Sequence, residues 1–274
     1  MASNRRWSPA IGLGAVALVT IIVATTVQPS AKEPIPVLQG YTVGDRYSGY
    51  VISTPETRKM QDDDFENPAF MWVEQAEEIW HRAQGEAKKS CASCHTDNPD
   101  ALKGIAPRYP KVIDGKLMTI EHRINQCRRE RMKADEWKWE GDEMLGMSAL
   151  VRLRSRGLPI SIGIDGEAAP FFEQGKAFYY QRRGALDMAC SHCHELNHGN
   201  KVRSERLSMG MPNGFPTYRL KWQKLGSLHR RFRGCNKNIR SEPYKQGSPE
   251  YTALELYVMS RARGLPIETP SVRK

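Results

Sequence analysis

Hydrophobic residues recur at helical spacing in two separate parts of this chain. The positions are Val73, Ala76, Trp80 and Ala83 in the earlier part, and Phe171, Gly175, Phe178 and Tyr179 in the later part. A spacing of three to four residues is typical of a helix that buries one face. We therefore predict a helix in each part.

Each predicted helix opens a longer segment, and both segments end in nearly the same sequence. Residues 154–160 read Arg-Ser-Arg-Gly-Leu-Pro-Ile, and residues 261–267 read Arg-Ala-Arg-Gly-Leu-Pro-Ile. The later copy contains a helix start, with Ser248 as the cap and Pro249 at the first helical position. Gly264 and Pro266 end that helix. The pattern predicts an internal duplication, residues 72–160 and 168–267, and an all-α fold.

The N-terminal region differs from the duplicated part. Arg5 and Arg6 precede an apolar run, residues 11–24, which is short for a stable membrane helix. This pattern predicts a signal peptide over residues 1–31, with an uncleaved membrane anchor as the alternative. Export places the protein in the periplasm, and no later stretch predicts stable membrane insertion of the mature chain.

The duplication sets the predicted domain boundaries. Residues 32–70 are rich in Pro, Gly and Asp, and we expect an ordered extension that wraps the first domain. We then expect two tandem cytochrome c-like haem domains, residues 71–163 and 164–274, with a linker over residues 161–170.

The haem prediction comes from a motif that occurs once in each copy. The motif is Cys-x-x-Cys-His, with residues Cys91, Cys94 and His95 in the first copy and Cys190, Cys193 and His194 in the second. Two thiols on one short turn reach the two vinyl groups of a porphyrin, and the histidine becomes an axial iron ligand. One Cys-x-x-Cys could be half of a zinc site. Two copies, each followed by histidine, predict two covalently bound haem c groups.

The remaining cysteines, Cys127 and Cys235, also occur once per copy. Each follows an arginine by four residues, Arg123 in the first copy and Arg231 in the second. Matched single cysteines favour thiolate as the second axial iron ligand. A disulfide between them, an open site and methionine ligation remain alternatives; the methionines are Met118, Met132, Met144, Met147, Met209, Met211 and Met259.

Charge separates the two copies. The chain of 274 residues carries a net charge of +10, and residues 219–245 contain nine basic residues and one acid, Glu242. The matching residues 111–140 contain eight basic residues and six acids. A basic surface around one haem favours a small dianion, because arginine binds oxyanions through a fixed fork of donors. Docking of an acidic electron-transfer partner is the alternative. We expect no nucleic-acid binding, because the chain has no such motif.

The motifs taken together resemble a known family. They are residues 62–68, which read Asp-Asp-Asp-Phe-Glu-Asn-Pro, then Trp72, the two haem motifs, residues 232–235 (Phe-Arg-Gly-Cys) and residues 239–243 (Ile-Arg-Ser-Glu-Pro). In this combination the chain resembles the SoxA subunit of the SoxAX cytochromes, in the form with two haems. The resemblance covers nearly all of the mature chain.

The resemblance implies an activity and partners. It implies cysteine-ligated haems, a small single-haem partner cytochrome (SoxX), and oxidative coupling of thiosulfate to a cysteine of a carrier protein (SoxYZ). We expect Arg231, with Arg233 and Arg240, to bind the dianion, and Cys235 to be both iron ligand and sulfur-handling group. The alternatives are a thiosulfate dehydrogenase that forms tetrathionate, and a two-haem electron-transfer protein without its own catalysis.

Overall fold

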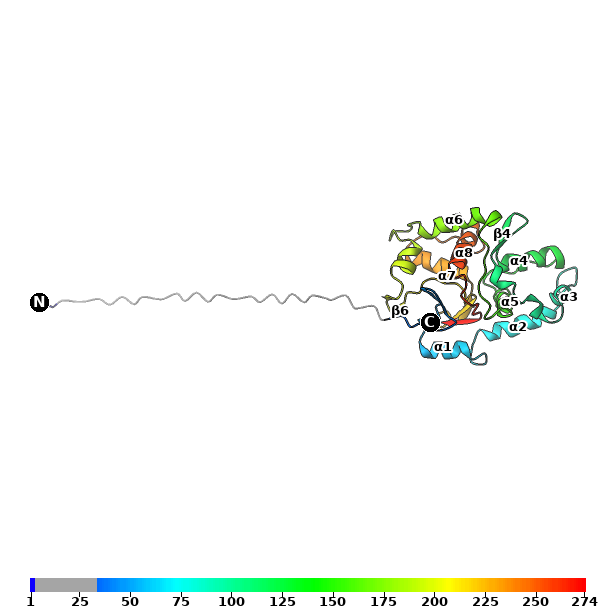
Figure 1. Cartoon of the computed structure of the whole chain (residues 1–274), viewed down its shortest axis with the longest axis horizontal. Helices are drawn as coiled ribbons and strands as arrows, with labels where there is room; N and C mark the ends of the chain where they lie inside the picture. Colours follow the sequence, from blue (N-terminus) through cyan, green and yellow to red (C-terminus); the bar gives the residue numbers. More distant parts are fainter. Residues whose placement is uncertain (3–33) are drawn as a thin grey trace. The chain divides into compact units, whose positions relative to one another are not determined.

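A computed structural model describes residues 1–2 and 34–274 of the chain. The predicted signal peptide, residues 1–31, therefore falls outside the described residues except for its first two positions. Across the part of the chain that is described, no helix is both long enough and apolar enough to cross a membrane. Helices predominate, and short strands connect them (Figure 1).

The first copy of the duplication is built around two packed helices, α2 (Phe70–His81) and α5 (Asp142–Leu153) (Figure 1). Val73, Ala76 and Trp80 are at most 2% exposed, which confirms the predicted buried face, whereas Ala83 lies beyond the end of α2. Between these helices lie α3 (Ala92–His95), the 3-10 turns η1 (Pro99–Leu102) and η2 (Ala106–Arg108), the hairpin β3 (Lys111–Ile113) and β4 (Lys116–Met118), α4 (Ile120–Cys127) and the π-helical turn η3 (Arg128–Met132).

The second copy repeats this order. Helix α6 (Ala169–Tyr180) packs against α8 (Pro249–Arg261) (Figure 1). The predicted cap is confirmed, because the Ser248 hydroxyl accepts a hydrogen bond of 3.3 Å from the Tyr251 N–H. The other elements are η4 (Gly166–Ala168), the π-helical turn η5 (His192–Leu196), the hairpin β5 (Lys201–Val202) and β6 (Glu205–Arg206), β7 (Thr217–Arg219), β8 (Lys224–Gly226) and α7 (Leu228–Asn238).

Equivalent backbone contacts connect the start of each copy to the end of its cysteine-bearing helix. Gly85 and Gly184, each six residues before a haem motif, have φ angles of 68° and 70°. A Cβ atom at Gly85 would lie 2.1 Å from the Met132 carbonyl oxygen, and one at Gly184 would lie 2.2 Å from that of Ile239. Glycine is required at both positions, because the backbone is left-handed and the neighbouring carbonyl is too close for a side chain.

The π-helical turn η3 accounts for a difference in length between the copies. Left-handed residues end both cysteine-bearing segments, Lys133 with φ 53° and Arg240 with φ 56°. Lys133 is six positions after Cys127, whereas Arg240 is five positions after Cys235. A π-helical turn holds one more residue than an α-helical turn, so η3 accommodates the extra residue of the first copy.

The all-α expectation did not include the strands. The described residues form a three-stranded sheet in which β7 pairs antiparallel with β8 and parallel with β9 (Ser271–Arg273). Strand β8 leads directly into Ser227, whose hydroxyl accepts a hydrogen bond of 3.1 Å from the Arg230 N–H and caps α7. The sheet therefore fixes where the helix that carries Cys235 begins.

The N-terminal extension contains β1 (Thr42–Val43), β2 (Arg46–Tyr47) and α1 (Pro55–Asp62). We expected it to wrap the first copy, and this is wrong for its β1–β2 hairpin. The Tyr47 hydroxyl lies 2.9 Å from Nδ1 of His198, and Arg46 donates a hydrogen bond of 2.7 Å to the carbonyl of Arg261. The reason is apolar packing, since Tyr47 belongs to the same buried cluster as Met209 and Met259 of the second copy.

A buried network of ionisable side chains joins the two copies. Nη2 of Arg152 lies 3.6 Å from a carboxylate oxygen of Glu121 and 3.6 Å from one of Glu255. Nε2 of His229 lies 3.1 Å from the other oxygen of Glu255. All four side chains are at most 6% exposed. Each buried charge therefore has an opposite charge beside it, which offsets the cost of removing these charges from water.

Candidate functional site

The second haem motif begins just before η5, which holds His194 in a fixed orientation. Nδ1 of His194 lies 2.8 Å from the Ser208 carbonyl oxygen. A carbonyl oxygen only accepts, so Nδ1 carries the proton and Nε2 is left with a free lone pair. Gly210, with φ 72°, lies against the ring, where a Cβ would be 3.0 Å from Cγ. The imidazole is therefore held with the nitrogen that ligates metals available.

Cys235 faces His194 from helix α7, and its sulfur lies within hydrogen-bond reach of the imidazole. Arg231 lies one helical turn before Cys235 on the same helix. Burial alone would raise the pKa of the Cys235 thiol, but Arg231, the His194 hydrogen bond and Arg219 outweigh it and lower this pKa to about 6. These positive charges favour the thiolate of Cys235, the form that binds metals and reacts with sulfur.

Arg219 contributes to this site and was not among the predicted site residues. It lies at the end of β7, and its guanidinium donates two hydrogen bonds to the Lys274 carbonyl, of 2.9 and 2.6 Å. Charge repulsion from Arg231 contributes to lowering the pKa of Arg219, after burial. The sequence contained it as the first basic residue of 219–245, but did not indicate that a strand brings it to a cysteine sixteen residues away.

The two other arginines that we expected to bind the dianion have contacts of their own. Arg233 donates a hydrogen bond of 2.6 Å to the Tyr244 carbonyl, which ties α7 to the loop before α8. Arg240 has a left-handed backbone after the end of α7, and its carbonyl accepts a hydrogen bond of 3.3 Å from the Ala185 N–H. Arg231 and Arg219 are the arginines whose charges contribute most to lowering the pKa of the Cys235 thiol.

The basic surface formed by residues 219–245 has more acidic partners in the fold than the sequence of this stretch indicates. Three carboxylates from outside residues 219–245 pair with its basic residues: Glu140 lies 3.8 Å from Arg230, Asp142 lies 2.8 Å from Lys224, and Glu205 lies 3.2 Å from Arg219. Among the described residues, Arg231 has no carboxylate at ion-pair distance. Arg231 is therefore one of the basic residues whose charge remains for a ligand, and it lies one helical turn from Cys235.

The first copy has the same residue types in a different electrostatic setting. The ring of His95 lies 5.9 Å from that of Trp80, whose indole N–H donates a hydrogen bond of 3.0 Å to the Thr96 carbonyl. Burial raises the pKa of the Cys127 thiol, and the positive charges of Arg123 and Arg131 only partly oppose it. Burial therefore favours the protonated form of the Cys127 thiol, in contrast to Cys235.

The geometry of the cysteines fits a covalently attached haem. No disulfide forms among the six cysteines, all of which lie in the described part of the chain, so Cys127 and Cys235 are not joined to each other. In the second copy Cys190 and Cys193 both lie close enough to Cys235 for their charges to interact. Two attachment thiols, a histidine with a free Nε2 and a facing thiolate are the donors that a haem c with His/Cys ligation needs.

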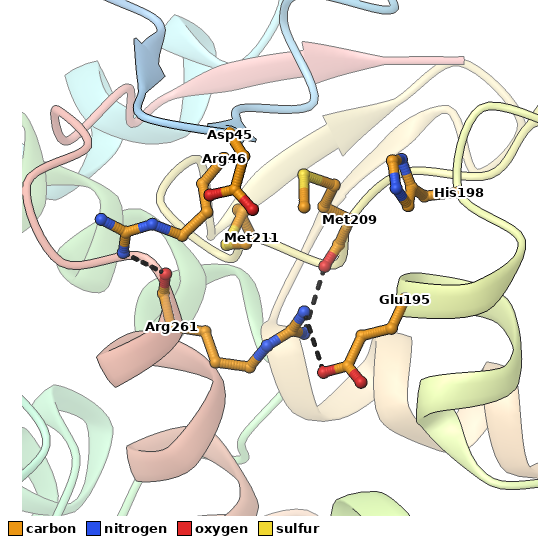
Figure 2. Close-up of a pocket in the computed structure, with 7 residues that line it drawn as sticks. All are labelled: Asp45, Arg46, Glu195, His198, Met209, Met211 and Arg261. Atoms are coloured by element: carbon orange, nitrogen blue, oxygen red, sulfur yellow. Dashed lines mark hydrogen bonds and ion pairs between the residues drawn. The ribbon is translucent and has the colours of Figure 1, made fainter.

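A cavity of about 380 Å³ lies beside the backbone that carries His194 (Figure 2). Its lining includes Glu195, Met209 and Arg261, with Asp45, Arg46, His198 and Met211. In Figure 2 the Arg261 guanidinium points between the Met209 carbonyl, at 3.2 Å, and the Glu195 carboxylate, at 3.3 Å. Because Glu195 already neutralises Arg261, this cavity is a weaker candidate for binding an anion than the surroundings of Arg231.

Comparison with known proteins agrees with these features. A family model described as "SoxA/TsdA, cytochrome c domain" matches residues 75–160. L-cysteine S-thiosulfotransferase subunit SoxA of Rhodovulum sulfidophilum is 42% identical over 255 residues, which cover 92% of this chain and 89% of that protein. The chain belongs to the SoxA family. The resemblance inferred from the sequence is thereby confirmed.

Further SoxA relatives agree in sequence and structure. The subunit SoxA of Paracoccus pantotrophus is 43% identical over 244 residues, which cover 88% of this chain and 84% of that protein. The crystal structure of SoxXA from P. pantotrophus contains a chain that matches with a TM-score of 0.81 and 44% identity, covering 84% of this chain and 87% of that chain. This SoxA-family chain therefore contains a cytochrome c domain, and haem c is its cofactor.

Proposed function

We propose that this SoxA-family chain is the cytochrome subunit of an L-cysteine S-thiosulfotransferase. It couples thiosulfate oxidatively to a cysteine of a SoxYZ-like carrier protein during sulfur oxidation. The single observation that carries the proposal is the convergence of Cys235, His194 and Arg231 in one site. That site combines a thiolate, an available imidazole nitrogen and an arginine without a carboxylate partner.

The chain's own residues bind and orient the substrate. Arg231 offers a planar fork of N–H donors to the sulfonate oxygens of thiosulfate, and Arg219 adds a second positive charge next to it. Thiosulfate held in this way presents its terminal sulfur toward Cys235. We assign substrate binding to Arg231, with Arg233 and Arg240 as outer members of the basic surface, and we assign the catalytic roles to Cys235 and Arg231.

The coupling reaction is an oxidation. A carrier thiolate and the terminal sulfur of thiosulfate form one sulfur–sulfur bond and give the carrier S-thiosulfonate, and two electrons are released. If the carrier cysteine starts as a thiol, one proton is released as well. Haem c supplies an acceptor that takes these two electrons one at a time. His194 and Cys235, which face one another, would hold its iron between them, with Cys190 and Cys193 as the attachment points.

We further propose that the chain carries two haems in tandem cytochrome c-like domains, residues 71–163 and 164–274, after an extension over residues 32–70. Cys91, Cys94, His95 and Cys127 would hold the first haem. The matching order of elements and the paired contacts of Gly85 and Gly184 support two equivalent haem units. The mixed charge of residues 111–140, with eight basic residues and six acids, supports a structural or electron-relay role for the first unit.

The chain needs a partner to accept electrons, because the sequence contains no third haem motif. We propose a heterodimer with a SoxX-like single-haem cytochrome. The structure with which this chain aligns is of a SoxXA complex, which supports such an assembly. We also propose a periplasmic location after cleavage of the signal peptide, residues 1–31. Mature protein from the native host should begin near Lys32 and have the mass of the chain plus two haems.

The decisive experiment compares cytochrome reduction and carrier modification in two mixtures. The chain with its partner cytochrome is incubated with thiosulfate alone, and with thiosulfate plus a carrier protein that has an exposed cysteine. The proposal expects reduction of the cytochromes and a mass increase of the carrier only in the second mixture. Formation of tetrathionate at the same rate without a carrier would instead establish a thiosulfate dehydrogenase. Absence of reduction in both mixtures would leave an electron-transfer protein.

A further inference from the structure

Glu205 is the carboxylate that pairs with Arg219, the arginine whose charge acts on Cys235 together with that of Arg231. It belongs to the β5–β6 hairpin, and its carboxylate is 3.2 Å from Nη2 of Arg219 and in direct contact with Nζ of Lys221. Arg219 is held independently by the Lys274 carbonyl and by the ring of Trp222, 5.1 Å from its guanidinium carbon. The arginine is therefore fixed in place by groups other than Glu205.

The side chains of Lys221, Glu205 and Arg219 differ in their exposure to solvent. The side chain of Lys221 is 54% exposed, that of Glu205 is 26% exposed and that of Arg219 is 10% exposed. The charge of Arg219 in turn acts on Cys235. Glu205 is therefore accessible from solvent, whereas Arg219, whose charge acts on Cys235, is mostly buried.

We propose that Glu205 is an internal competitor for the substrate anion, occupying on Arg219 the position that an oxyanion takes when it binds beside Cys235. This inference deepens the proposed function and rests on it for the identity of the anion. It makes the β5–β6 hairpin a selectivity device that an incoming dianion displaces.

The physical basis is a comparison of charges. A carboxylate and an oxyanion use the same donors of an arginine fork, so only one of them occupies that position. A monoanion that displaces Glu205 exchanges one negative charge for another and gains little. The charges of Arg219 and Arg231 both act on the single charge of Glu205, so a dianion in its place is attracted by both arginines with a second negative charge. The arrangement therefore favours thiosulfate and other dianions over monoanions.

The hairpin is built to allow this displacement. Its strands have two residues each, and residues 201–204 are exposed. A two-stranded hairpin of this length contributes little stability by itself. Moving Glu205 away from Arg219 therefore requires only a local change, and Lys221 can follow because its side chain is largely in solvent.

The test measures anion binding without turnover. Sulfate is titrated calorimetrically into the oxidised holoprotein in complex with its partner cytochrome, with nitrate as the monoanion. The Glu205→Gln variant removes the competing charge and is expected to tighten sulfate binding about three- to tenfold. Nitrate binding should tighten by a similar factor, because either anion displaces the same carboxylate, and the KM for thiosulfate should fall accordingly. Glu205→Asp keeps the charge and is expected to remain close to the original protein.

Control variants separate competition from a structural effect. Asp187→Asn removes another paired carboxylate of the second copy, which lies 2.7 Å from Arg182, and should not change sulfate affinity. Arg219→Gln should weaken sulfate binding, and adding Glu205→Gln to it should then have no further effect. Unchanged or weaker sulfate binding by Glu205→Gln alone would overturn the inference. Loss of carrier modification with sulfate binding intact would instead count against the proposed function.

Discussion

Pro159 lies opposite Pro266 in an antiparallel bridge that joins the ends of the two copies. The hydrogen bonds around it are reciprocal. The Gly157 N–H donates to the Ile267 carbonyl at 2.9 Å, and the Gly264 N–H donates to the Ile160 carbonyl at 3.0 Å. Each closing motif is therefore the binding partner of the other, which gives this contact approximate two-fold symmetry. The near identity of the two motifs follows, because each has to fit the same backbone.

The first prediction concerns the glycines of this contact. Gly157 and Gly264 have φ angles of 82° and 85°, in the left-handed region. A Cβ at Gly157 would meet nothing within 4 Å, so the cost of Gly157→Ala comes from the backbone alone. We expect a loss of about 1–2 kcal/mol in the free energy of unfolding for Gly157→Ala, measured by chemical denaturation.

Gly163→Ala is the matched control for that variant. It also places a Cβ in open space, but its φ is not in the left-handed region. We expect its stability to equal that of the original chain or to exceed it slightly. Equal losses from Gly157→Ala and Gly163→Ala would contradict the assignment of the cost to backbone conformation.

The second prediction concerns the dependence of stability on pH. Burial would raise the pKa of Glu121, but Arg152 and hydrogen bonds that include the Ser148 hydroxyl lower it below its ordinary value of 4.5. Glu121 therefore contributes stability above pH 4.5, and this contribution is lost as the pH falls through the lower value of the folded chain. Glu121→Gln should cost about 1.5–3 kcal/mol at neutral pH, because the hydrogen bonds to the charged Glu121 carboxylate are lost while Arg152 keeps Glu255 as a partner.

The pH profile of unfolding, measured with urea, checks this assignment. The difference in stability between the original chain and Glu121→Gln should shrink as the pH falls below 4.5. Glu77→Gln is the control, because Glu77 also pairs with an arginine, Arg154, but its side chain is 47% exposed. That variant should change stability by less than about 1 kcal/mol. A difference for Glu121→Gln that stays constant with pH would rule out the proposed ionised pair.

The third prediction concerns the axial ligands. With Cys127 and Cys235 as thiolate ligands, the oxidised protein should have low-spin haems without the charge-transfer band of a methionine–iron bond. Cys127→Met and Cys235→Met should each introduce that band for one haem. The band at full strength in the original protein would show that methionine ligates one of the irons.

The helices of this protein could be predicted because their signals are local. The apolar spacing of Val73, Ala76 and Trp80 and the cap at Ser248 depend only on neighbouring residues, and the structure confirms both. The strands could not be predicted in the same way. Strand β7 has three buried residues and no alternation, and it is stabilised by β9, more than fifty positions later in the chain.

Only part of the candidate site could be predicted from the sequence. His194, Cys235 and Arg231 were found because a motif or a repeat marks them. Arg219 and Glu205 have no such mark, since their roles depend on how β6 and β7 are placed relative to α7. The count of acids in residues 219–245 was likewise misleading, because carboxylates from distant segments pair with this surface.

The central claim is that the second copy performs the chemistry. Arg231→Ala and Arg123→Ala remove equivalent arginines, four residues before Cys235 and Cys127. The measurement is the rate of thiosulfate-dependent carrier modification by each variant, with the haem content of both verified by mass. Loss of one charge-assisted contact in the transition state costs about 1.5–3 kcal/mol, so Arg231→Ala should slow the reaction roughly ten- to a hundredfold. Arg123→Ala should leave the rate largely unchanged. Equal losses in the two variants would contradict the assignment of the active site to Cys235.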